Sequence, residues 1–88
     1  MDDSKPLLVF PCDYPIKVMA RVVPELRAQL DAIVARHAGP LEAHRISERP
    51  SAQQNFIGLT YLIHAHGERQ IAALFEELKQ CPAVMLIL

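Results

Sequence analysis

The stretch Ile16-Lys17-Val18-Met19-Ala20-Arg21-Val22, together with the segment PELRAQLDAIVARHAG at 24–39, decides the fold of this chain. The first stretch alternates apolar with polar or mixed residues, which is typical of a strand with one buried face. We therefore expect its core-facing residues to be Ile16, Val18, Ala20 and Val22. The second segment starts with proline, ends at Gly39 and Pro40, and predicts a helix. Its spacing places five residues on one stripe of that helix: Leu26, Leu30, Ile33, Val34 and His37.

The rest of the chain predicts three more strands and a second helix. Residues 41–49 are polar and charged and stop at Pro50, as expected of a solvated edge strand protected against pairing with another chain. Residues 55–65 carry apolar groups on both faces, which indicates a central strand. Gly67 opens a helix whose apolar residues recur at i, i+3, i+4 and i+7, namely Ile71, Leu74, Phe75 and Leu78. The uncharged run 83–88 predicts a last strand within the sheet.

This order of elements predicts an α+β fold of the ferredoxin-like βαββαβ type, a two-layer sandwich. Right-handed crossovers place both helices on one face of an antiparallel sheet with strand order 4-1-3-2. A chain of 88 residues cannot divide its apolar groups between two cores. We therefore expect one domain over residues 1–88, with residues 1–13 as an N-terminal extension that packs on the sheet or lies apart from it.

The composition excludes several classes of protein. A net charge of −1 provides no basic field for a phosphate backbone, so we expect no nucleic-acid partner. The apolar run 7–10 is too short for a signal-peptide core or a membrane span, so we expect no membrane partner and a cytoplasmic location. Cys12 and Cys81 should lie at opposite ends of neighbouring strands, roughly 20 Å apart against the 6 Å or so that a disulfide needs. We expect two free thiols.

The segment FPCDYPIKVMARVVPEL at 10–26 resembles the YbeD-like family of small bacterial proteins. The resemblance lies in a Phe-Pro pair, an aromatic residue, and a Lys-Val-Met strand that runs into Pro-Glu-Leu. An Arg-His-Ala end to the first helix, an Asn-aromatic start to the third strand and a second helix ending Leu-Phe-Glu-Glu-Leu extend it over residues 7–88. Each motif alone is weak, but their order and spacing together are specific.

The resemblance implies a ferredoxin-like fold similar to ACT regulatory domains, which bind small effectors beside metabolic enzymes. ACT domains generally have a glycine-containing turn after the first strand. In this chain the turn is Val22-Val23-Pro24. The resemblance therefore implies the ACT-like fold more strongly than it implies amino-acid binding.

The sequence predicts no catalytic residue, no metal and no cofactor. His64 and His66 form an H-x-H pair, but a third metal ligand is missing. Cys12 has neither a basic cluster nor a helix N-terminus beside it in sequence to lower the pKa of its thiol. The chain also lacks a nucleophile elbow and a glycine-rich phosphate loop.

The more informative feature is the sheet face that the helices leave uncovered. We expect cations and large apolar groups to meet on this open face, with Met85 as a further candidate beside Lys17, Met19, Arg21, Phe56 and Leu62. Such a patch marks an interaction surface, or it is covered by the chain's own segment 7–14. Both interpretations remain open from the sequence.

The leading hypothesis is a non-enzymatic regulatory or adaptor domain that binds a protein partner, or a second copy of itself, through the open sheet face or a strand edge. The alternative is a small-molecule effector sensor that resembles an ACT domain. In that case the ligand would lie near residues 22–25 or at a dimer interface.

Overall fold

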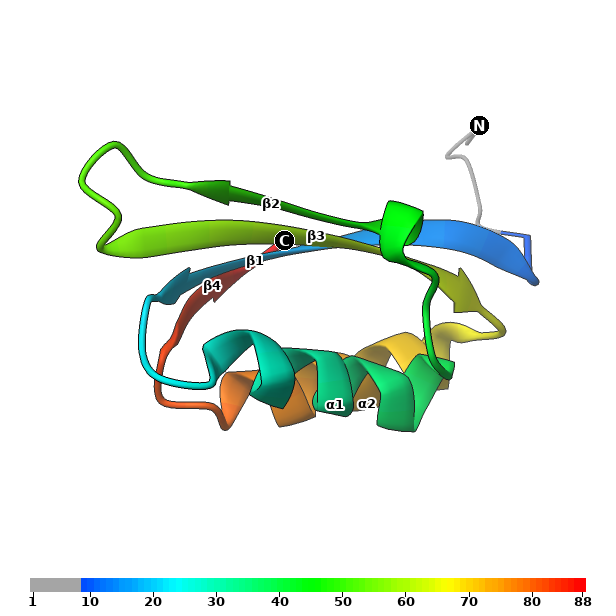
Figure 1. The fold of residues 1–88 in the computed structure, drawn as a ribbon. Helices are drawn as coiled ribbons and strands as arrows, with labels where there is room; N and C mark the ends of the chain where they lie inside the picture. The colour runs from blue at the N-terminus through cyan, green and yellow to red at the C-terminus, as the bar shows by residue number, and fades with distance from the viewer. Residues whose placement is uncertain (1–8) are drawn as a thin grey trace, which may run out of the picture.

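A computed structural model describes residues 9–88 of the chain. Short connections and one hairpin join its elements (Figure 1). In chain order they are β1 (Cys12–Arg21), α1 (Leu26–Ala38), the 3-10 turn η1 (Ala43–Arg45), β2 (Ile46–Pro50), β3 (Phe56–Ala65), α2 (Glu68–Lys79) and β4 (Val84–Ile87).

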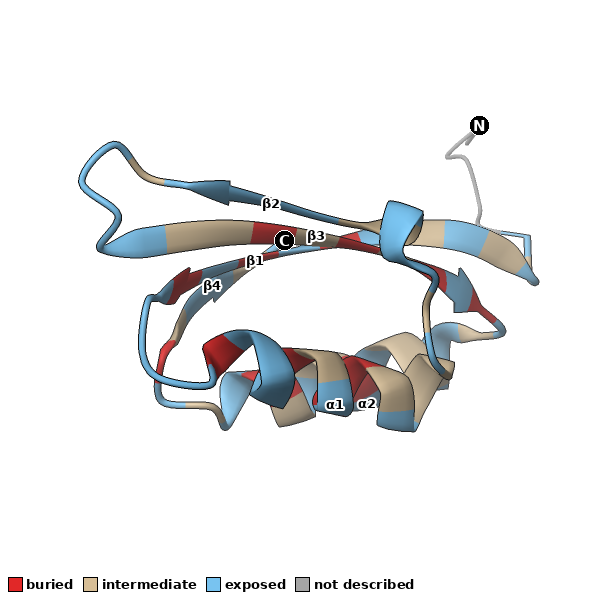
Figure 2. Cartoon of the chain, viewed as in Figure 1, coloured by how far each residue is buried: buried red, intermediate tan, exposed pale blue. Residues whose placement is uncertain are grey.

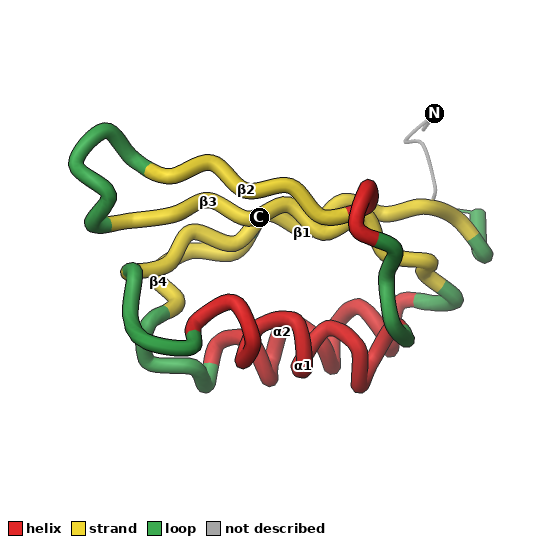
Figure 3. The backbone as a smooth tube through the Cα atoms, viewed as in Figure 1, coloured by secondary structure: helices red, strands yellow, loops and turns green. Residues whose placement is uncertain are grey.

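The four strands form one antiparallel sheet in the order β2-β3-β1-β4, which is the predicted order 4-1-3-2. Both helices lie against the same face of this sheet, as the backbone trace shows (Figure 3). The predicted ferredoxin-like sandwich is therefore confirmed, and no helix of residues 9–88 lies on the opposite face of the sheet. No helix within residues 9–88 is long and apolar enough to cross a membrane.

The core lies between the sheet and the helices, and the buried residues face one another across that layer (Figure 2). Alternate residues of β1 and β3 supply the sheet side, and their register places Val18 opposite Leu59. The helix side comes from the predicted apolar stripes. The largest fully buried side chains are Tyr61, Ile16, Leu30, Leu59, Ile63, Leu74, Leu78, Val18 and Val34. Fully burying each large aliphatic side chain contributes about 1.5–3 kcal/mol, so these stripes hold the two layers together.

Strand β1 starts at Cys12, four residues before the stretch in which the alternation is clearest. Pro15 lies inside it without interrupting the ladder. The amide nitrogens of Lys17 and Arg21 both donate towards β4, so the odd residues of β1 direct their N–H groups away from β3. No described residue pairs with Pro15 on that side, and its missing N–H therefore loses no ladder bond.

Two other expectations about the strands are wrong. Val22 does not face the core but is 51% exposed, because β1 ends at Arg21 and the chain turns towards α1. The predicted strand 41–49 is shorter than expected, because its first half forms a loop and the turn η1. Residues 12 and 13 belong to β1, whereas residues 1–8 of the expected N-terminal extension lie outside the described residues. Coverage of the sheet by that extension stays a prediction.

Candidate docking surface on the open sheet face

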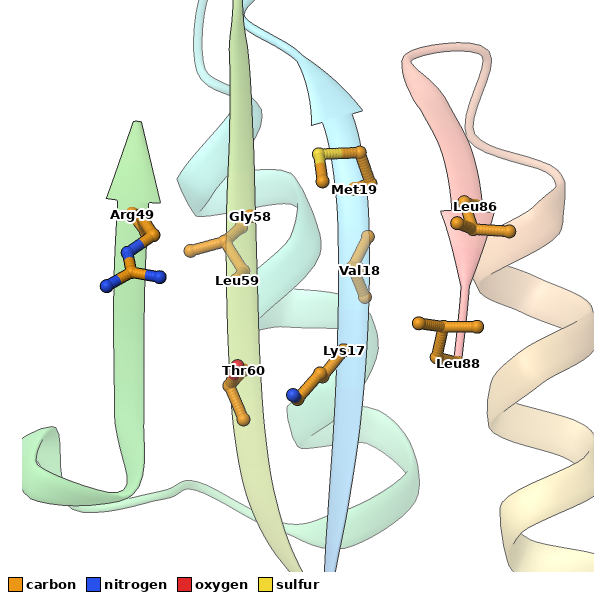
Figure 4. A pocket seen from close by; sticks show the side chains of 9 residues that line it. All are labelled: Lys17, Val18, Met19, Arg49, Gly58, Leu59, Thr60, Leu86 and Leu88. Atoms are coloured by element: carbon orange, nitrogen blue, oxygen red, sulfur yellow. The ribbon is translucent and has the colours of Figure 1, made fainter. Parts of the chain in front are cut away.

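The open face of the sheet carries a central depression of about 220 Å³, shown from close by in Figure 4. All four strands contribute to it, because the odd residues of β1 and the even residues of β3 point away from the helices. We define the central depression by the side chains and the glycine that face it: Lys17, Met19, Arg49, Gly58, Thr60, Leu86 and Leu88.

Gly58, the third residue of β3, lines the depression and places no side chain in it. A Cβ atom built on Gly58 would lie 3.8 Å from the carbonyl oxygen of Arg49 and 4.0 Å from Cε of Met19. Both distances are ordinary van der Waals contacts, so the fold itself has room for a larger residue. Glycine weakens a strand interior and often marks the close approach of another group. Its presence here fits a surface that something else fills.

The charged side chains that the described residues place beside the depression are positive. Lys17 and Arg49 stand on opposite sides of Gly58, and Arg21 lies beyond Met19 on the same face of β1. None of the three forms an ion pair with another side chain in the described part of the chain. The apolar wall on the β4 side is well exposed, with Leu86 at 52% and Leu88 at 67%. Among residues 9–88, the face therefore joins cations that form no ion pair with another side chain to exposed aliphatic groups.

All five predicted surface residues lie on this face, but they lie in three different parts of it. Lys17 and Met19 line the central depression. Arg21 and Phe56 are paired across β1 and β3 at one end of the sheet. Leu62 lies towards the other end, opposite Pro15, and is half-buried.

That second end of the face is polar and internally satisfied. Arg45, reaching over from η1, donates from Nη2 to Oδ1 of Asp13 at 2.6 Å and from Nε to the carbonyl oxygen of Leu62 at 2.9 Å. Nδ1 of His64 lies 3.6 Å from the same carboxylate of Asp13. Because these groups bind one another, this end of the face has fewer polar groups free to bind a ligand than the central depression has.

Sequence reasoning missed the contributions of the two edge strands. Arg49 faces the depression because β2 pairs with β3 in a register that puts it opposite Gly58. On the other side the sequence suggested Met85, but an irregularity in the β1–β4 ladder puts Leu86 opposite Met19 instead. Met85 lines a second depression between β4 and α2. Residues 83–88 are all apolar, so their sequence does not indicate where that irregularity occurs.

The other residues that the sequence singled out do not assemble into a chemical site. Within residues 9–88 no group of three or more His, Cys, Asp and Glu side chains could hold a metal ion. His64 ends up beside Asp13, while His66 donates its backbone N–H to Oε1 of Gln70. Cys12 and Cys81 are free thiols, as predicted, and both are half-buried.

One buried titratable group ties the helix layer to the sheet. The hydroxyl of Tyr61 in β3 donates to Oδ1 of Asp31 in α1 at 2.7 Å. Asp31 also accepts from Nε of Arg27, whose Nη1 donates to Glu48 in β2 at 2.6 Å. Burial, reinforced by the neighbouring carboxylate, raises the pKa of Tyr61 far above its ordinary value of 10.0. The phenol stays protonated, and its role is to position the sheet and α1.

A two-layer βαββαβ domain is a fold that hosts many unrelated functions, so the fold alone assigns no reaction to this chain. The chain belongs to the family described as "Protein of unknown function (DUF493)", which its residues 5–88 match. This confirms the resemblance to the YbeD-like family. The chain is 32% identical to a UPF0250 protein of Paraburkholderia phytofirmans over 85 residues, covering 97% of this chain and 96% of that protein. It is 35% identical to a UPF0250 protein of Hahella chejuensis over 91 residues, with both chains fully covered.

A solved structure shares the fold. The solution structure of the C-terminal domain of the MgtC protein from Mycobacterium tuberculosis superposes with a TM-score of 0.60. The match covers 93% of this chain and 89% of that domain at 20% sequence identity, so the likeness is one of fold. The family description assigns no reaction and no ligand.

Proposed function

We propose that this domain is a non-enzymatic adaptor of the cytoplasm whose open sheet face docks a protein partner. The observation that supports this proposal is the central depression, where Lys17 and Arg49 flank Gly58 and an exposed aliphatic wall lies on the β4 side. A partner that fits this face presents acidic side chains to the cations and an apolar side chain to the space above Gly58. The shape and charge of the face favour a regulatory contact over catalysis.

The magnitudes favour a protein over a small effector. Covering Met19, Leu86 and Leu88 completely yields at most about 1.5–3 kcal/mol each, and they are 43–67% exposed. Association costs about 4–15 kcal/mol in lost rigid-body freedom, so a ligand confined to the depression gains little. Small-molecule sites usually enclose about 300–1,000 Å³, more than the 220 Å³ here. A partner that also covers Phe56 and Arg21 gathers enough contact area.

The alternative of an ACT-like effector sensor receives less support. The turn at residues 22–25 is where the sequence located a ligand, and there Glu25 adopts the left-handed conformation with φ of 62°. Glycine tolerates this conformation best, so a larger residue constrains the backbone of that turn. Thermal stabilisation by amino acids or nucleotides, growing with ligand concentration, would favour the sensor over the adaptor.

The experiment is an affinity capture from native cytosol with mass spectrometry. We compare the wild type with Arg49→Glu and Gly58→Leu, which reverse a charge in the depression and fill it. Arg69→Glu is the matched control, because it makes the same charge change at an exposed position of α2. A protein retained by the wild type and the control but lost by both face variants supports the proposal. Identical captures from all four folded proteins would contradict it.

A further inference from the structure

The two edges of the sheet are unequally protected against pairing with another chain. The β2 edge carries Glu48, Arg49 and Pro50, which are the residue types that block edge-to-edge association. The β4 edge carries none of these, since residues 83–88 are uncharged and contain no proline. An apolar, unprotected edge strand is a template for a further strand.

The backbone of β4 has free hydrogen-bonding groups on its outer side. Lys17 and Leu88 exchange both of their backbone hydrogen bonds, with N···O distances of 3.1 and 2.8 Å. In an antiparallel ladder the direction of the N–H and C=O groups alternates along the strand, so those of Ile87 point away from β1. Within residues 9–88 nothing pairs with this outer side, because β4 is the last strand of the sheet.

Helix α2 borders the same edge and presents a stripe that complements itself. Phe75 and Lys79 line a depression of about 390 Å³ together with residues 84–87. Glu68 and Ala72 precede them at i, i+4, i+7 and i+11 spacing, so all four lie along one side of the helix. The stripe is negative at its start, apolar in the middle and positive at its end. Glu76 also lies 3.5 Å from Lys79, but both side chains are exposed, and such pairs are weak.

We propose that a second copy of this chain binds along this edge, with β4 pairing antiparallel to β4 and α2 lying antiparallel to α2. A two-fold axis makes each contact occur twice. It brings Glu68 of each copy towards Lys79 of the other, with the apolar residues Ala72 and Phe75 between them. The outward N–H and C=O of Ile87 gain partners, and the two sheets become one. The charge pattern of α2 selects a second copy over an unrelated strand, because a stripe with opposite ends matches its own reverse.

The first test is the oligomeric state of the full chain by sedimentation equilibrium. Ile87→Pro removes the outward N–H without removing a bond to β1, and Ile87→Ala shortens the same side chain but keeps the N–H. We expect a dimer for the wild type and for Ile87→Ala. For Ile87→Pro we expect a dissociation constant raised at least tenfold, since each 1.4 kcal/mol changes an equilibrium tenfold. If the wild type stays monomeric at protein concentrations up to about 1 mM, a range in which weak association would still be measured, the proposal is wrong.

The second test does not depend on the proline variant folding. Glu68→Lys and Lys79→Glu each replace two attractive contacts of the dimer by repulsive ones, and each should raise the dissociation constant roughly tenfold. The double variant Glu68→Lys/Lys79→Glu restores opposite charges and should recover most of the loss. The two residues are eleven positions apart on one helix, about 16 Å, so they do not interact within one copy. Additive losses in the double variant would refute the antiparallel helix contact.

Discussion

Replacing Tyr61 by Phe should destabilise the domain in a way that depends on pH. The substitution removes one oxygen from a fully buried side chain and leaves its ring packed in the core. It deletes the 2.7 Å hydrogen bond to Asp31, the contact that joins β3 to α1. Asp31 keeps its hydrogen bond from Arg27 and is partly exposed to water, so its carboxylate is not left without a partner.

A hydrogen bond to a charged group contributes about 1.5–3 kcal/mol when its loss leaves the charge unsatisfied. Because water and Arg27 compensate Asp31, we expect a loss of about 1–2 kcal/mol at pH 7. Urea unfolding followed by far-UV circular dichroism measures it. With a slope of about 1–2 kcal/mol per molar urea, typical of a small domain, the midpoint should fall by about 1 M.

The alkaline limb provides the sharper test. The pKa of Tyr61 is raised in the folded state, so the folded protein holds the phenolic proton above pH 10 while the unfolded chain releases it. The wild type therefore has this stabilisation in full below about pH 10 and loses it as pH rises, by about 1.4 kcal/mol at pH 11. The Phe variant has no such titration. The gap between the two proteins should close between pH 9 and 11, and a gap that stays constant over that range would refute the role of the hydroxyl.

Three further outcomes are expected. Glu77→Gln should destabilise the domain at neutral pH, because Arg36 and His37 lower the pKa of Glu77 below 4.5. The difference in unfolding free energy between this variant and the wild type should vanish as the pH falls below that value, which acid unfolding measures. Gln54→Gly should raise the melting temperature by roughly 2–6 °C. The left-handed φ of 62° costs a residue with a side chain about 1–2 kcal/mol, and the greater backbone entropy of glycine in the unfolded chain offsets part of that gain. Gln53→Gly is the control and should not raise the melting temperature. Gly58→Ala should fold normally by circular dichroism and weaken partner capture, because the added methyl group enters the central depression at contact distance without a clash.

The sequence predicted those features that depend on one strand or helix at a time. Alternation along β1 and β3 assigned each residue to a face, because the side-chain period of a strand is fixed by its geometry. Residues 57–65 thereby separated into a core face and an open face without knowledge of their neighbours. The element order then determined the topology, since few sheets are compatible with short right-handed connections.

The composition of the central depression depends instead on relations between strands. Arg49 reaches it only because a turn of five residues between β2 and β3 sets the register opposite Gly58. Leu86 replaces Met85 because the β1–β4 ladder slips by one residue after Met19. A slip of one residue moves a side chain to the other face, and nothing in a short apolar run marks where it occurs. The cationic character of the face was therefore only partly visible in the sequence.

The two proposed surfaces meet at β4, and this makes them separable by mutation. Leu86 lies on the open face and also borders the unprotected edge, so Leu86→Asp should impair both partner docking and dimer formation. Arg49 lies on β2, at the opposite edge of the sheet, so Arg49→Glu should impair docking alone. Ile87→Pro acts on the outer backbone groups and should impair the dimer first. If a bivalent partner must bind two copies at once, Ile87→Pro will also lower capture of that partner, although the central depression is intact. Fusing two chains in tandem should then restore capture.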